Sequence, residues 1–137
     1  MYSAILSVHG YFAWAALALI ILAVVAALLS KGAFKDNYRK MALYGLIAAH
    51  LQLVIGLILY FVSPNGFSNL SGESMKNSFT RLLAVEHPFT NIVAIILITI
   101  GYSQAKRLDD GSRKILIYYG IGLVLLLSRI PWSTWLG

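Results

Sequence analysis

The sequence predicts an all-α membrane protein with four transmembrane helices in an up-down-up-down bundle. Of its 137 residues, 59% are hydrophobic and only 12% are charged, whereas a soluble domain is about 45–50% apolar and about 25% charged. A spanning helix takes about 20 residues, so four spans and their short connections use nearly the whole chain. We therefore expect one transmembrane domain over residues 1–137, which functions within the bilayer or at its surface.

Four apolar runs, separated by polar or turn-forming segments, give the order of the helices. Charged connections follow the first and third runs, a Ser-Pro-Asn-Gly turn follows the second, and Pro131 ends the fourth. Because the connections are short, consecutive helices are expected to be antiparallel neighbours. The predicted spans are approximately 4–29, 41–62, 82–105 and 115–132.

The distribution of basic residues predicts the orientation. Residues 31–40 and 106–114 carry four basic residues each, whereas Lys76 is the single basic residue of the 63–80 loop. Since Lys and Arg collect in cytoplasmic loops, the two short connections are predicted to be cytoplasmic and both termini periplasmic. The net charge of +6 is then a feature of a multi-pass bacterial inner-membrane protein and does not indicate nucleic-acid binding.

The residue types available for chemistry are few. The sequence has no cysteine, which excludes disulfides, thiolate metal sites, Fe–S clusters and covalently attached c-type haem. Two of its three histidines, His9 and His87, are predicted to lie about 6 Å below the outer surface, whereas His50 lies about 18 Å from it. Arg129 and Arg81 fall close to the level of the first two.

The predicted depths favour a cofactor between two helices. The first and third helices are diagonal partners in such a bundle, with axes about 11–14 Å apart. A non-covalent haem b with one axial imidazole from His9 and one from His87 would fill that gap. Arg129 and Arg81 would neutralise its propionates, and His50, on the same helix as Gln52, is an alternative ligand. This hypothesis implies electron transfer near the periplasmic face, with quinone or a respiratory complex as partner.

Other interpretations of the same residues stay open. Arg129 can extend to the interface without a ligand, Glu86 can form a surface ion pair with Arg81, and the histidines can serve as interfacial, capping or interhelical groups. His9, His87 and Glu86 together could form a three-ligand zinc or copper site. The main rival function is a cofactor-free accessory subunit of a larger respiratory or transport complex, with His50 at the partner interface.

A set of short motifs along nearly the whole chain resembles a known family. The motifs are His9, Ala49-His50-Leu51-Gln52-Leu53 with Gly56 and Tyr60, Glu86-His87, Ile98-Thr99-Ile100-Gly101 before Ala105-Lys106-Arg107, and Ile130-Pro131-Trp132. In these the chain resembles the small four-helix "cytochrome b"-like inner-membrane proteins of Bacteroidota. The resemblance implies a b-type haem. Members often carry an Arg-Trp pair after the first histidine, where this chain has Ala13-Trp14, so that propionate pairing would fall to Arg129 or Arg81.

Overall fold

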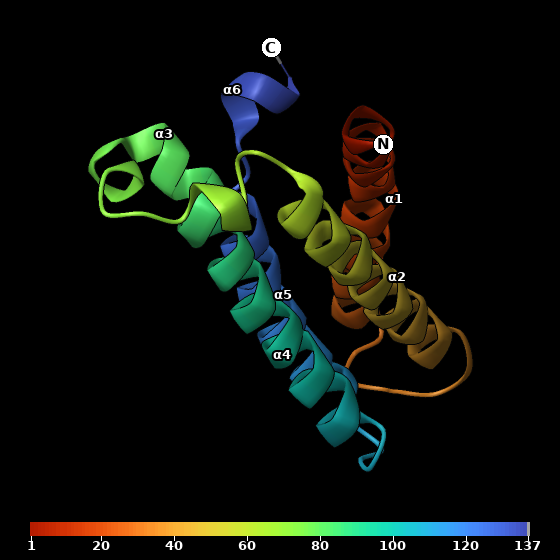
Figure 1. Cartoon of the computed structure of the whole chain (residues 1–137). Coiled ribbons are helices and arrows are strands. Elements are labelled where there is room, and N and C mark those ends of the chain that lie inside the picture. Colours follow the sequence, from red (N-terminus) through yellow and green to blue (C-terminus); the bar gives the residue numbers. More distant parts are fainter. Residues whose placement is uncertain (137) are drawn as a thin grey trace.

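A computed structural model describes residues 1–136, and all regular secondary structure in that range is helical (Figure 1). The prediction of an all-α protein is thus confirmed. The elements are α1 (Tyr2–Leu29), α2 (Asp36–Val62), the short helices η1 (Phe67–Asn69) and η2 (Ser74–Lys76), α3 (Ser78–Arg81), the π-helix η3 (Leu82–Glu86), α4 (His87–Ala105), α5 (Ser112–Ser128) and α6 (Trp132–Trp135).

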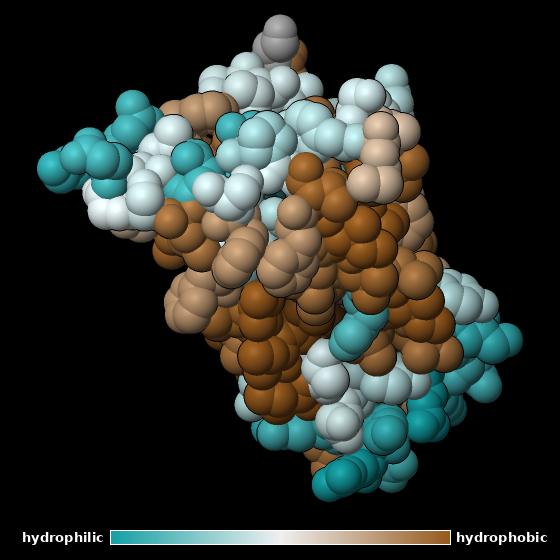
Figure 2. Space-filling model, viewed as in Figure 1, coloured by the Kyte–Doolittle hydropathy of each residue, from teal (hydrophilic) through white to brown (hydrophobic). Residues whose placement is uncertain are grey.

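Three helical segments are long and apolar enough to cross a membrane. They are Tyr2–Leu29, Asp36–Val62 and Ser78–Ala105, and they contain the first three predicted spans. Figure 2 shows a broad hydrophobic band between two hydrophilic ends of the molecule. Helix α5 has 17 residues and is about 26 Å long, a few ångströms less than a hydrocarbon core of about 30 Å. A fourth span and the periplasmic placement of the termini remain predictions.

The fourth predicted segment, 115–132, is not one helix in the structure. Helix α5 begins at Ser112, ends at Ser128, and is followed by Arg129 with φ −125° and ψ 21°. Pro131 explains the break, because the residue before a proline is disfavoured in the α conformation. The chain then forms the separate short helix α6.

The helices associate as two pairs. Helix α1 packs along α2, α4 packs along α5, and the pairs meet through α1 with α5 and α2 with α4. This order places α1 and α4 on a diagonal. In Figure 1 the start of α1 and helix α6 lie toward one end of the molecule, and the connections 30–35 and 106–111 lie toward the other.

Tight packing is concentrated toward the two connections, in what we call the packed half. Its core is formed by Ala23, Ala27, Phe34, Ala42, Ile98, Ala105, Ile115 and Tyr119, and it is continued at the border with the other half by Ile20, Ala49 and Ile95. Small residues allow the helices to approach closely, as expected for helices in lipid. At Gly101 a Cβ atom would overlap Tyr118, and at Gly122 it would lie 2.9 Å from a side-chain carbon of Ile98. The other half contains a cavity.

Candidate functional site

A cavity of about 680 Å³ lies between the two helix pairs, in what we call the cavity half. Its walls include apolar side chains of α1, α2, α4 and α5. The polar side chains in its lining include His9, Gln52, His87 and Asn91. Ligand pockets commonly measure about 300–1,000 Å³ and have apolar walls with a few converging polar groups. The cavity is therefore the candidate functional site.

His9 of α1 and His87 of α4 meet across this cavity. Their ring centroids are 6.2 Å apart and their ring planes are inclined by 89°. Both residues come from the diagonal pair of helices, so the imidazoles extend inward from opposite walls. The structure thus brings together the two histidines that the sequence placed at one depth.

Gln52 of α2 fixes the protonation of the His9 ring. Its Nε2 donates to the His9 backbone carbonyl at 2.8 Å and contacts His9 Nδ1 at 3.1 Å. Because an amide nitrogen only donates, Nδ1 holds a lone pair and the proton of the neutral ring is on Nε2. Gln52 Oε1 is buried and has no hydrogen-bond partner among residues 1–136. Gly56 adjoins the same ring, since a Cβ there would lie 3.1 Å from His9 Cε1.

The His87 ring has the opposite tautomer. Its Nδ1 donates to the backbone carbonyl of Arg129 at 2.8 Å, which leaves the lone pair on Nε2. Asn91 Nδ2 lies 3.2 Å from that Nε2 and can donate to it. Asn91 Oδ1, like Gln52 Oε1, is buried without a partner in the part of the chain that the structure describes.

Asn91 was not among the predicted site residues. It follows His87 by four residues, a spacing that puts two side chains on one helix face and was the available signal. That spacing alone does not distinguish a polar partner of the imidazole from a residue that contacts another helix.

Two tryptophans adjoin the cavity at α6. Trp135 lines it and stacks on Trp14 of α1 with ring centroids 4.5 Å apart. A Cβ at Gly10 would be 3.4 Å from Trp135 Nε1, so α6 packs closely on α1.

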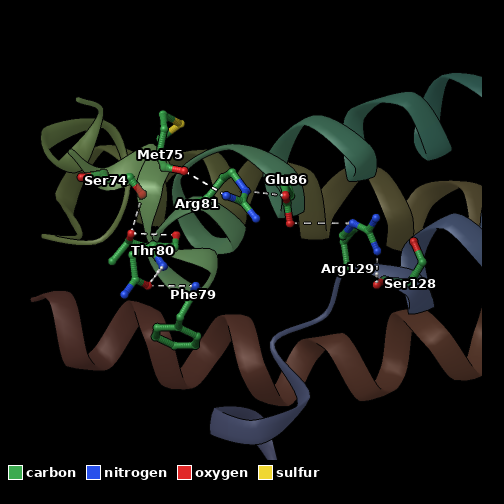
Figure 3. Close-up of polar contacts among 9 residues, drawn as sticks. Ser74, Met75, Phe79, Thr80, Arg81, Glu86, Ser128 and Arg129 are labelled. Carbon is green, nitrogen blue, oxygen red and sulfur yellow. Dashed lines mark hydrogen bonds and ion pairs between the residues drawn. The ribbon is translucent and has the colours of Figure 1, made fainter. Parts of the chain in front are cut away.

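The two predicted propionate partners are joined by one carboxylate beside the cavity (Figure 3). Arg81 Nε donates to Glu86 Oε2 at 2.9 Å, and Arg129 Nε lies 3.9 Å from Glu86 Oε1. Arg81 also donates to the Met75 carbonyl at 2.9 Å. Neither arginine is part of the cavity lining among the described residues. The predicted ion pair between Arg81 and Glu86 is confirmed.

The three-ligand metal site is not formed. In residues 1–136 no group of three or more His, Cys, Asp and Glu side chains is arranged to hold a metal ion. The Glu86 carboxylate faces the two arginines, which explains why it does not join His9 and His87.

His50 lies apart from the other two histidines, on an exposed face of α2. Its Nδ1 donates to the Leu46 carbonyl at 2.8 Å, and its Nε2 lies 3.4 Å from the Thr99 hydroxyl of α4. Gln52, two residues further along the helix, faces the cavity. Two residues two positions apart on an α-helix point about 200° apart around its axis, which accounts for this separation.

Comparison with known proteins does not extend the assignment, since no family model, no curated protein and no solved structure matches the chain.

Proposed function

We propose that the cavity binds a b-type haem with His9 and His87 as axial ligands, and that the protein transfers electrons in the bacterial inner membrane. The spacing of the two imidazoles carries the proposal. A metal–imidazole bond is about 2.0–2.1 Å long, so two imidazoles on opposite sides of one ion have centroids about 6.3 Å apart. The separation of 6.2 Å between the His9 and His87 rings fits this arrangement.

The position, volume and polarity of the cavity also suit a haem. Cofactor sites in helical bundles are built from side chains of facing helices, and here the histidines come from diagonal helices. The volume of about 680 Å³ lies within the usual range for small-molecule sites. The cavity walls are largely apolar, and low polarity is one of the factors that set a haem potential.

The hydrogen bond from His87 to the Arg129 carbonyl supports its role as a ligand. A ligating histidine almost always donates its other ring N–H to a carbonyl, a carboxylate or water, which fixes the tautomer and the ring orientation. His87 Nδ1 makes that bond at 2.8 Å, so its Nε2 has the lone pair that coordination needs. Asn91 Nδ2 would have to give up its contact with Nε2.

Coordination by His9 requires a change at Gln52. The Nε2 of His9 carries the proton in the described arrangement, so that proton must move to Nδ1 before Nε2 can coordinate. Among the described residues Gln52 Oε1 lacks a partner, and it could accept an Nδ1 proton if the amide turned and gave up its bond to the His9 carbonyl. Gln52 would hold the ligating tautomer of His9 only in that turned position.

The charges beside the cavity suit an anionic group. Two guanidinium groups, Arg81 and Arg129, share the single carboxylate of Glu86, which leaves one net positive charge for propionates. His50 is a less suitable ligand because it lies on the exposed face of α2. Haem supplies one-electron redox chemistry when bound, and quinone or a respiratory complex is the proposed partner.

The proposal is tested by purifying the protein in detergent from haem-replete cells and recording its reduced-minus-oxidised absorption spectrum. We expect the spectrum of a six-coordinate b-type haem at about one haem per chain. A colourless protein that co-purifies with a larger assembly would overturn the proposal in favour of a cofactor-free accessory subunit. Elemental analysis of the same sample detects any metal other than iron.

A further inference from the structure

The segment that leads into His87 is a π-helix, Leu82–Glu86, in which the backbone N–H of His87 bonds to the carbonyl of Leu82 five residues earlier. Such segments are rare and are frequent at functional sites. Pro88 follows directly after His87. The backbone geometry here needs an explanation, because it determines the direction of one of the two cavity histidines.

Pro88 lacks the N–H that an α-helical register would direct at one particular carbonyl. In a regular α-helix the N–H of residue 88 would bond to the carbonyl of Ala84, but proline has no N–H and its ring clashes with that carbonyl. Ala84 is only 1% exposed, so water does not readily replace the donor. The hydroxyl of Tyr60, on α2, donates to the Ala84 carbonyl at 2.8 Å.

Tyr60 is itself held in place at the end of α2. Its ring packs against Phe61 and Phe67, with centroid distances of 5.6 and 6.5 Å. Gly66 approaches the Tyr60 backbone so closely that no Cβ could be accommodated there. The turn after α2 therefore fixes the hydroxyl that reaches across to Ala84.

We infer that Tyr60 is a positioning residue for His87, because its hydroxyl replaces the N–H that Pro88 lacks and so stabilises the π-helix. One extra residue in a helical turn rotates the following residues by about 100°. The π-helix thus sets the side of the segment from which His87 extends. The role of His87 orientation in haem binding rests on the proposed function. The replacement of the missing N–H by the Tyr60 hydroxyl does not.

A double-mutant cycle between Tyr60 and Pro88 tests, without reference to haem, whether the Tyr60 hydroxyl takes the place of the missing N–H. Tyr60→Phe removes the hydroxyl and keeps the ring, and Pro88→Ala restores an N–H that can reach the Ala84 carbonyl. In detergent-purified protein, amide hydrogen exchange in residues 82–87 should become roughly two- to tenfold faster in Tyr60→Phe. The same change should have little effect in the Pro88→Ala background.

Tyr44→Phe is the matched control, since Tyr44 lies on the same helix and is 48% exposed. It should leave exchange in residues 82–87 unchanged. Equal acceleration by Tyr60→Phe in both backgrounds, or none in either, would overturn the inference.

The absorption spectrum tests whether Tyr60 positions His87 for haem binding. We expect Tyr60→Phe to lower haem occupancy or to shift the ligand-sensitive bands, and Tyr44→Phe to do neither. A normal spectrum in Tyr60→Phe would contradict the positioning role. If the wild-type protein holds no haem, the proposed function fails, while the exchange cycle still decides whether Tyr60 replaces the proline N–H.

Discussion

The packed half and the cavity half of the helical bundle differ in whether their buried polar atoms have hydrogen-bond partners. In the packed half the Tyr119 hydroxyl donates to the Ala42 carbonyl at 2.7 Å. In the cavity half Gln52 Oε1 and Asn91 Oδ1 are buried and have no hydrogen-bond partner among the described residues. A buried polar atom that lacks a partner costs about 1–3 kcal/mol. The comparison indicates that the packed half stabilises the fold, whereas the cavity half carries a cost in stability that fits its proposed role in binding.

The largest effect on stability is expected in the packed half, at Gly101. A Cβ there would overlap Tyr118 on α5, so Gly101→Ala must separate α4 from α5 at a cost of about 1–3 kcal/mol. Denaturant unfolding in detergent measures the loss. Gly120→Ala is the control, because a Cβ at that glycine has no neighbour within 4 Å and should not destabilise. Equal stability of the two variants would contradict the close approach of α4 and α5.

In the cavity half, Gln52→Leu should leave stability nearly unchanged and lower the affinity for haem. The variant loses the contacts of the amide with His9 but also removes an unpartnered oxygen, so the free energy of unfolding of the haem-free protein should change little. Loss of the group that orients a ligating histidine typically costs about 10–100-fold in metal affinity. Haem titration into haem-free protein measures it. Unchanged haem affinity would show that Gln52 does not orient His9.

Tyr119→Phe should give the smallest of these effects. It removes one hydrogen bond in the packed half and should cost about 0.5–1.5 kcal/mol of unfolding free energy. Haem affinity should be unaffected, since Tyr119 is not part of the cavity lining among the described residues. The same unfolding and titration experiments measure both quantities, and a loss of haem affinity would contradict the separation of the two halves.

Much of the fold could be predicted from the sequence. Hydropathy located the three long apolar helices, and counting residues from their ends placed His9 and His87 at one depth. The end of α5 was missed because the apolar run continues past Ser128, although Pro131 interrupts the helix.

The finer geometry of the site depends on contacts between helices, which a linear pattern does not contain. Pro88 can be read from the sequence, but the hydroxyl that bonds to the Ala84 carbonyl in the π-helix before it comes from Tyr60 on another helix. The ion pair of Glu86 with Arg81 could be proposed from the sequence, where the two residues are close. Its second partner, Arg129, comes from the end of α5. The unpartnered oxygens of Gln52 and Asn91 also become apparent only once the neighbours of each amide are known.

The most direct measurement is the haem content of three variants that each lack one histidine. They are purified in parallel and compared by reduced-minus-oxidised spectra. His9→Ala and His87→Ala should each lose the six-coordinate b-type spectrum, because each removes one axial ligand. His50→Ala, which removes a histidine outside the cavity, should keep it. Normal haem in His9→Ala or His87→Ala, or loss of haem in His50→Ala alone, would contradict the assignment of the ligands to the cavity half.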